Sequence, residues 1–204
     1  LWDRKTIPYK RDFCFTLLID LSGSMRGEKI RETFRAAILT AEVLSRVGLQ
    51  MEVLGFQDEL LEFKSFEETF SDEVRARIAG MPAEVEDKNP GGHNQSDWND
   101  DGYCVQQAAT RLAARPAKDR FLVVFSDGLP IPSSAHSGSQ WDLGNILKKI
   151  EEKKEVRQIG LGLGSGTEHV KKFYRNNAVI PNVRDLPRAM RELFQNIIEH
   201  PDTY

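Results

Sequence analysis

The sequence predicts an α/β protein: a Rossmann-like, doubly wound, mostly parallel sheet with helices on both faces and one antiparallel edge strand. Continuous apolar runs, such as residues 13–19 (FCFTLLI) and 120–125 (RFLVVF), are typical of strands buried on both faces. Segments with apolar residues at spacings of three or four, typical of amphipathic helices, alternate with these runs. Because strands that are joined through helices pair in parallel, this alternation indicates helices on both faces of one sheet.

The first half of the chain contains the expected hairpin and the longest polar segment. In order, the expected elements are a strand over residues 13–19, a helix over 30–47, strands over 51–56 and 59–63, and a helix over 71–79. Gly48 ends the first helix, and a tight turn at residues 57–58 makes the two later strands an antiparallel hairpin. Residues 82–101 are rich in Gly, Asn and Asp, and we expect a recognition loop that is mobile without a partner.

The second half alternates more regularly between helix and strand. Its expected elements are a helix over 102–114, a strand over 120–125, a helix over 141–153, a strand over 156–163, a short helix over 168–174, a short strand at 178–179 and a final helix over 188–199. We expect one domain over residues 13–200, between an N-terminal extension (1–12) and a C-terminal tail (201–204). The chain opens at Leu1 without an initiator Met, and we expect it to be part of a longer polypeptide.

Composition excludes several function classes. The 204 residues carry 31 acidic and 28 basic side chains, a net charge of −3, so no nucleic-acid partner is expected. Mean hydropathy is −0.46, and no apolar run approaches the roughly 20 residues of a membrane helix, so no membrane partner is expected. Cys14 and Cys104 lie in apolar or helical segments and are expected to be buried and free, which favours a reducing, cytoplasmic compartment.

A turn rich in side-chain oxygens follows the first expected strand. Asp20, Ser22 and Ser24 alternate along it in the pattern D-x-S-x-S. One carboxylate and two hydroxyls suit a hard cation such as Mg²⁺, which keeps several waters and needs few protein ligands. Asp127 follows the strand over 120–125, and ligands bind beyond the carboxyl ends of strands in such sheets. We therefore expect a divalent-cation site here, with Asp127 accepting hydrogen bonds from metal-bound water.

These residues carry a family resemblance. Residues 20–24 (DLSGS), after a buried strand, resemble the metal-ion-dependent adhesion site (MIDAS) of the von Willebrand factor A (VWA) domain, and residues 126–128 (SDG) resemble the later Asp motif of that family. The resemblance covers nearly the whole chain from about Phe13 onward. It implies the VWA fold, a bound Mg²⁺ (or Mn²⁺ or Ca²⁺) and a protein partner that offers an Asp or Glu carboxylate to the metal.

The third ligand segment departs from the family pattern. The family uses a Thr from an intervening loop, and the aligned stretch here is residues 99–105 (NDDGYCV), with Asn99 where the Thr is expected. Asn99 is the first candidate for this ligand, and Asp100 and Asp101 are alternatives. The two aspartates are equally suited to cap the helix that follows.

Within the VWA family, the sequence is most similar to the C-terminal domain of the CobT subunit of aerobic cobaltochelatase. The similarity lies in residues 21–27 (LSGSMRG), 52–56 (EVLGF), 99–102 (NDDG) and 159–162 (IGLG). It implies a non-catalytic, MIDAS-type interaction module of a larger protein in cobalamin biosynthesis. Its implied partner is an AAA+ ATPase subunit, with metal insertion into a tetrapyrrole taking place elsewhere.

Other functions and sites fit the residues less well. A Mg²⁺-dependent phosphohydrolase on a similar sheet is the alternative function. Such an enzyme needs a second Asp two positions after the first as its general acid and base, but that position is Ser22 here. A metal-free structural domain is the third possibility. The glycine-rich residues 160–166 lack the spacing of a nucleotide-binding loop, and the histidines lack zinc-ligand spacing, so that His136 and His169 are expected at the surface. Trp98 and Trp141 flank the expected metal edge, as partner anchors or as packed loop residues.

Overall fold

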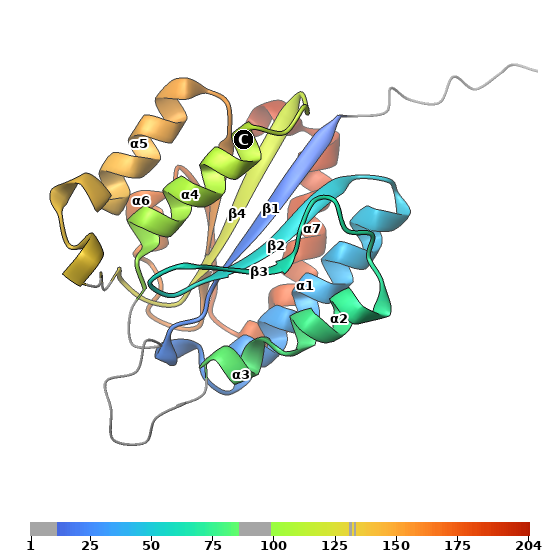
Figure 1. The fold of residues 1–204 in the computed structure, drawn as a ribbon, viewed down its shortest axis with the longest axis horizontal. Helices are drawn as coiled ribbons and strands as arrows, with labels where there is room; N and C mark the ends of the chain where they lie inside the picture. Colours follow the sequence, from blue (N-terminus) through green and yellow to red (C-terminus); the bar gives the residue numbers. More distant parts are fainter. Residues whose placement is uncertain (1–11, 86–98, 131, 133) are drawn as a thin grey trace, which may run out of the picture.

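A six-stranded sheet forms the centre of the computed structural model, which describes residues 12–85, 99–130, 132 and 134–204 (Figure 1). The strands are β1 (Phe13–Asp20), β2 (Gln50–Phe56), β3 (Leu60–Lys64), β4 (Asp119–Ser126), β5 (Arg157–Leu163) and β6 (Asn176–Ile180). They pair in the order β3-β2-β1-β4-β5-β6, and all neighbours are parallel except β3, which runs antiparallel to β2. The predicted sheet, mostly parallel with one antiparallel edge strand, is confirmed.

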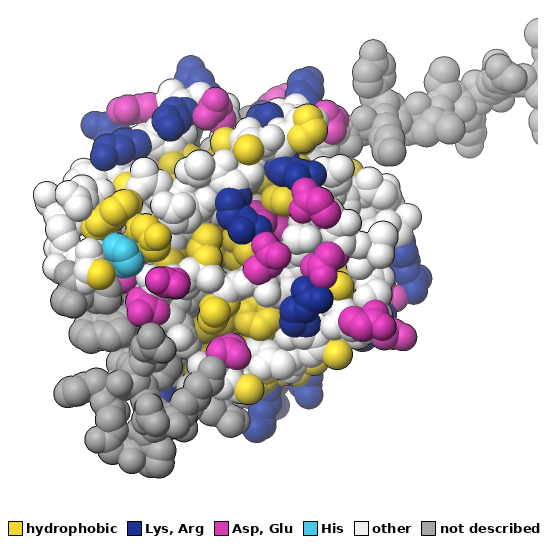
Figure 2. Space-filling model, in the orientation of Figure 1, with side chains coloured by type: hydrophobic (Ala, Val, Ile, Leu, Met, Phe, Trp, Pro, Cys, Tyr) yellow, Lys and Arg dark blue, Asp and Glu magenta, His cyan; other side chains and the backbone are white. Residues whose placement is uncertain are grey.

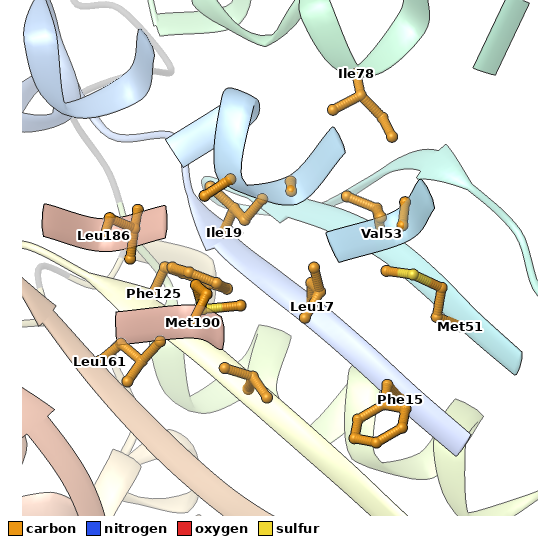
Figure 3. Close-up of a cluster of buried hydrophobic side chains, with 14 of the residues drawn as sticks. Phe15, Leu17, Ile19, Met51, Val53, Ile78, Phe125, Leu161, Leu186 and Met190 are labelled. Atoms are coloured by element: carbon orange, nitrogen blue, oxygen red, sulfur yellow. The ribbon is translucent and has the colours of Figure 1, made fainter. Parts of the chain in front are cut away.

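Helices cover both faces of this sheet. One face carries α1 (Glu28–Arg46), α2 (Asp72–Ala79), α3 (Met81–Val85) and α7 (Leu186–Glu199), and the other carries α4 (Asp101–Ala113), α5 (Leu143–Lys153) and α6 (Val170–Phe173). Successive side chains of a strand point to opposite faces, so β1 sends Phe15, Leu17 and Ile19 into the first layer (Figure 3) and Cys14 and Leu18 into the second. Both cores therefore share one central strand, whose carboxyl end ranks among the most buried parts of the chain.

Several elements begin or end away from their expected positions. Residues 82–85, expected in a loop, belong to α3, while residues 86–98 of that expected mobile loop lie outside the described residues. Helix α5 begins at Leu143 rather than residue 141, because the Asp142 side chain accepts a hydrogen bond from the backbone N–H of Asn145 and caps the helix. Helix α7 begins at Leu186 because Pro187 is compatible with a first helical turn.

The structure describes the C-terminal end of the chain and not the N-terminal end. Residues 1–11, most of the expected N-terminal extension, lie outside the described residues. At the other end, the expected tail forms a 3-10 turn (Pro201–Thr203), and Tyr204 packs, partly buried, against the core. The boundaries at residues 13 and 200 remain a prediction.

The surface agrees with the mixed charge of the composition. Figure 2 shows Lys and Arg side chains interspersed with Asp and Glu over α4 and the neighbouring strands, without a large region of one sign on this face. Cys14 and Cys104 are buried and free, as predicted, and burial raises the pKa of the Cys14 thiol to about 11. Among the described residues, no helix is both long enough and apolar enough to cross a membrane.

Candidate metal centre

The carboxyl ends of β1 and β4 lie side by side, and they position the polar cluster. The two strands are paired in parallel up to Ile19 and Phe125, so the residues that follow them emerge at the same edge of the sheet. Asp20 is the last residue of β1, and Asp127 comes directly after β4. The expected convergence of the two polar segments is therefore present.

Hydrogen bonds link four of the expected site residues in a row: Asp20, Ser22, Ser24 and Asp127. The backbone N–H of Ser22 donates to Oδ1 of Asp20 over 2.8 Å, which holds the carboxylate against its own turn. The hydroxyls of Ser22 and Ser24 are 2.9 Å apart, and the Ser24 hydroxyl donates to Oδ1 of Asp127 over 2.6 Å. Because the single Ser24 proton is directed to Asp127, Ser22 is the donor between the two hydroxyls, and one lone pair of Ser24 is left for another partner.

The segment before α4 brings three more polar side chains to the cluster. The Asn99 amide nitrogen donates to Oδ2 of Asp20 over 3.4 Å and to the carbonyl oxygen of Leu129 over 3.3 Å. The Asp100 carboxylate contacts Nδ1 of His136 and makes no capping hydrogen bond, although Asp100 is the N-cap residue. Asp101 is 2% exposed, and its Oδ2 has no hydrogen-bond partner within the described part of the chain.

Of the three alternatives for the third ligand, Asp101 thus offers the free oxygen. Asn99, the first candidate, presents its amide nitrogen to Asp20 and supports that carboxylate instead. A buried acceptor without a partner costs about 1–3 kcal/mol, so an orphaned carboxylate oxygen signals a missing donor or cation.

The buried carboxylates are electrostatically uncompensated. The pKa of Asp20 is raised to about 6, first by burial and then by the nearby Asp127, against the hydrogen bonds from Ser22 and Asn99. Burial also raises the pKa of Asp101 well above its usual range, with Asp20 as the next cause. Within the described residues, neither Asp20 nor Asp101 forms an ion pair. A positive charge beside these two carboxylates would stabilise their ionised forms and lower both pKa values.

Lys29 supplies a positive charge to the third carboxylate, and sequence reasoning missed it. Its Nζ lies 2.5 Å from Oδ2 of Asp127 and donates to the carbonyl oxygen of Ser24 over 3.3 Å. A lysine in the first turn of a helix faces the positive end of the helix dipole, which is an unfavourable place for it. That local conflict was the signal available in the sequence.

The donor set fits a hard divalent cation. In the described ranges, no three His, Cys, Asp or Glu side chains gather closely enough to hold a metal, so a site built from acids and imidazoles alone is not present there. Asp20 and Asp101 bring carboxylate oxygens, and Ser22 and Ser24 bring hydroxyl oxygens. Oxygen donors of this kind suit Mg²⁺, Mn²⁺ or Ca²⁺. The buried Oδ2 of Asp101, which has no hydrogen-bond partner in the described residues, is an oxygen that such a cation would satisfy.

An aromatic cluster borders the same edge. Tyr103 and His136 stack with ring centroids 3.9 Å apart, and Trp141 meets Tyr103 edge-on at 5.1 Å. Gly102 permits this packing, because a Cβ there would come within 1.7 Å of the Trp141 carbonyl oxygen. Trp141 is therefore both packed and partly exposed, whereas Trp98 lies outside the described residues.

Two histidines differ from the surface positions expected for them. His136 is half-buried in the aromatic cluster and contacts Asp100. His169 is 9% exposed, and its Nε2 lies 3.4 Å from the Ser126 hydroxyl. Burial lowers the pKa of His169, since the charged imidazolium loses solvation.

Tyr174, which belongs to none of the sequence motifs, interacts electrostatically with the cluster. The hydroxyl of Tyr174 is buried and, within the described residues, has no hydrogen-bond partner. Burial raises the pKa of Tyr174 well above its usual range, and Asp101 and Asp20 raise it further, so this hydroxyl lies in the field of both carboxylates. An unsatisfied hydroxyl and an unsatisfied carboxylate oxygen therefore occur in one buried region.

The fold and the cluster define a VWA-type domain: a doubly wound sheet with a D-x-S-x-S turn and a Ser-Asp-Gly turn at one edge. More closely, the chain belongs to the family described as "Cobalamin biosynthesis protein CobT VWA domain", whose model matches residues 3–89 and 93–200.

Three similar proteins illustrate the range of this likeness. The uncharacterized protein YojO of Bacillus subtilis (strain 168) is 26% identical over 197 residues, which are 92% of this chain and 30% of YojO. The PilB minor pilin of Streptococcus sanguinis has a TM-score of 0.68 at 13% identity, covering 94% of this chain and 62% of the pilin. Proximal thread matrix protein 1 of the mussel byssus, with a zinc-occupied MIDAS motif, has a TM-score of 0.58 at 12% identity, and the match covers 90% of this chain and 47% of the mussel protein. The two solved structures share the fold, and this chain spans under a third of YojO.

Proposed function

We propose that this domain is a metal-dependent protein-interaction module of the MIDAS type, and that it does not itself catalyse a reaction. The observation that carries the proposal is the pair of buried, electrostatically interacting carboxylates, Asp20 and Asp101, which have no ion-pair partner among the described residues. The turn that holds Asp20 also carries the hydroxyls of Ser22 and Ser24. The zinc-occupied MIDAS motif of the mussel protein, on a similar fold, supports a divalent cation at this edge.

In this proposal each residue has a separate role. Asp20, Ser22, Ser24 and Asp101 hold Mg²⁺ (or Mn²⁺ or Ca²⁺) through oxygen atoms. Asp127 accepts a hydrogen bond from the Ser24 hydroxyl and another from metal-bound water. Asn99 keeps Asp20 in place through its amide nitrogen. The bound cation supplies an open coordination position, which takes an Asp or Glu carboxylate from the partner.

The family supports a partner within a metal chelatase. A CobT-type domain is expected to act in a larger protein beside an AAA+ ATPase subunit, with ATP hydrolysis and metal insertion outside this domain. The phosphohydrolase alternative is less well supported, because Asp20 is fully buried and Ser22 stands where the second acid is needed. Phosphate-ester hydrolysis that disappears in Asp20→Ala would favour that enzyme.

Calorimetry with Mg²⁺ tests the proposed site. The double variant Asp20→Ala, Ser22→Ala should bind Mg²⁺ at least about 100-fold more weakly than the wild type, because a carboxylate and a hydroxyl ligand are lost. Asp119→Ala is the matched control: it removes a carboxylate at the opposite end of β4 and should leave the affinity unchanged. Equal Mg²⁺ binding by the wild type and the double variant would refute the site.

The same titration separates the candidates for the third ligand. Asp101→Ala should weaken Mg²⁺ binding about tenfold or more, whereas Asn99→Ala should weaken it less, since in this proposal Asn99 positions Asp20 and is not itself a ligand. The partner is tested by pull-down of an AAA+ ATPase subunit with and without EDTA, with Asp20→Ala as the control. Undiminished binding in both cases would exclude this edge as the interface.

A further inference from the structure

Lys29 reaches the rim of the cluster from a helix that carries none of the family motifs. Its ammonium contacts Asp127 and the Ser24 carbonyl oxygen. The lysine side chain is 32% exposed, whereas the Asp127 side chain is fully buried. One end of Lys29 therefore faces solvent next to the place where a partner would approach the cation.

The surrounding structure makes room for this lysine. Gly164, in the loop after β5, has a φ of +93°, and a Cβ there would lie 3.1 Å from Cε of Lys29. A side chain at Gly164 would crowd the lysine stem and strain the loop. The unfavourable helix dipole at this position is offset by the ion pair with Asp127.

The positive charge of Lys29 balances the net charge of the cluster. A divalent cation is neutralised by Asp20 and Asp101, and Asp127 then leaves one negative charge, which would repel an acidic partner. The ammonium of Lys29 removes that excess. An ammonium also has three N–H donors, of which two point to Asp127 and Ser24 in the structure.

We propose that Lys29 is a recognition residue for the acidic side chain of the partner. It balances Asp127 and donates its remaining N–H to the same carboxylate that binds the cation. This inference rests on the proposed function, because it presupposes a cation at Asp20. It adds a second, protein-borne anchor for the partner and restricts the ligand to a carboxylate that can bridge the cation and an ammonium.

The proposal predicts effects of opposite sign in one variant. Lys29→Met removes a positive charge near the cation, so Mg²⁺ should bind about 3- to 10-fold more tightly. The same variant should bind an acidic probe about tenfold more weakly in saturating Mg²⁺. Lys29→Arg keeps the charge and should behave like the wild type in both measurements. Arg31→Met removes an exposed charge from the same helix and controls for general electrostatics.

The experiment uses calorimetry for Mg²⁺ and an NMR chemical-shift titration for the probe. The probe is a blocked glycine pentapeptide with one central glutamate, and the same peptide with glutamine shows whether the carboxylate is recognised. Tighter Mg²⁺ binding together with weaker glutamate-peptide binding in Lys29→Met alone is the expected result.

The other outcomes are distinguishable. If Lys29→Met and Arg31→Met behave alike, Lys29 has no recognition role, although the proposed function stands. Weaker Mg²⁺ binding in Lys29→Met would make the lysine a positioning residue for Asp127 and would also overturn the proposal. A wild-type protein that binds no Mg²⁺ would remove the proposed function and this inference together.

Discussion

Two carboxylates on neighbouring strands, Glu52 of β2 and Asp20 of β1, are both fully buried, yet their surroundings differ. Glu52 accepts a hydrogen bond from the Thr16 hydroxyl over 2.8 Å and two from the Arg111 guanidinium over 3.2 and 3.0 Å. Asp20 accepts hydrogen bonds from Ser22 and Asn99, and no ion pair reaches it within the described residues. Glu52 therefore has a resident cation, and Asp20 does not.

This difference separates a structural carboxylate from a candidate ligand. A buried charge is tolerated when it is paired and hydrogen-bonded. Glu52 meets that condition with protein groups alone, so it needs nothing from solution. Asp20 and the orphaned Asp101 do not, and a divalent cation would complete them. Removing the partners of each carboxylate in turn tests this difference.

The largest expected effect comes from Arg111→Ala. It leaves the buried Glu52 carboxylate with a hydrogen bond from Thr16 but no ion-pair contact within the described residues, and should lower the free energy of unfolding by about 3 kcal/mol, because a buried charge loses its partner. Arg175→Ala, which breaks an exposed pair with Glu151, should cost less than about 1 kcal/mol. Urea unfolding measures both. Similar small losses would mean that Glu52 does not depend on its resident cation.

The pH dependence of the metal-free protein comes next in size. The pKa of Asp20 is raised from 3.8 to about 6, so between these pH values the folded protein keeps a proton that the unfolded chain releases. The stability contribution of this group therefore falls as pH rises from about 4 to about 6, and then stays constant. Relative to Asp20→Asn, the wild type should lose about 2–3 kcal/mol across this window, since the shift is about two pKa units at about 1.36 kcal/mol each.

Added Mg²⁺ should oppose that loss, since protons and the cation compete for the same carboxylate. The stabilisation by Mg²⁺ should therefore be larger at pH 7 than at pH 5. Urea unfolding of the wild type and Asp20→Asn, with EDTA or Mg²⁺ at each pH, measures this. A wild-type profile parallel to that of Asp20→Asn would contradict the uncompensated burial of Asp20.

The smallest expected effects come from two hydroxyl deletions of opposite sign. Thr16→Val removes a donor to the buried Glu52 and should destabilise the protein by about 1.5 kcal/mol. Tyr174→Phe removes a buried hydroxyl that has no partner in the described residues and should stabilise the metal-free protein by up to about 1 kcal/mol. Thermal unfolding in EDTA compares them. A loss of stability in Tyr174→Phe would show that its hydroxyl is satisfied.

The fold was predictable from the sequence because the buried strands have a recognisable apolar pattern. The run from Phe13 to Ile19 is apolar at every position except Thr16, as a strand buried on both faces requires, and the D-x-S-x-S turn marks its carboxyl end. It could not place α3, because Pro82 and the polar residues after it read as loop, while Met81 and Val85 anchor that short helix in the core.

The candidate site was predictable in part, for a similar physical reason. Asp20, Ser22 and Ser24 are neighbours in sequence, so their spacing shows that they share a turn. Asn99, Asp100 and Asp101 compete for one role, and only their contacts distinguish them: an amide on Asp20, a carboxylate on His136 and a carboxylate with a free oxygen. The ion pair of Lys29 and the buried hydroxyl of Tyr174 depend on tertiary packing, which single-sequence patterns do not encode.

The position of Mn²⁺ in a crystal of the domain grown with that cation tests the proposed metal site most directly. Anomalous scattering locates Mn²⁺ without assumptions about its ligands. We expect one strong anomalous peak within about 2.2 Å of a carboxylate oxygen of Asp20 and of the Ser22 and Ser24 hydroxyls, with Asp101 Oδ2 turned toward it. No peak at this edge in saturating Mn²⁺, or a peak elsewhere only, would contradict it.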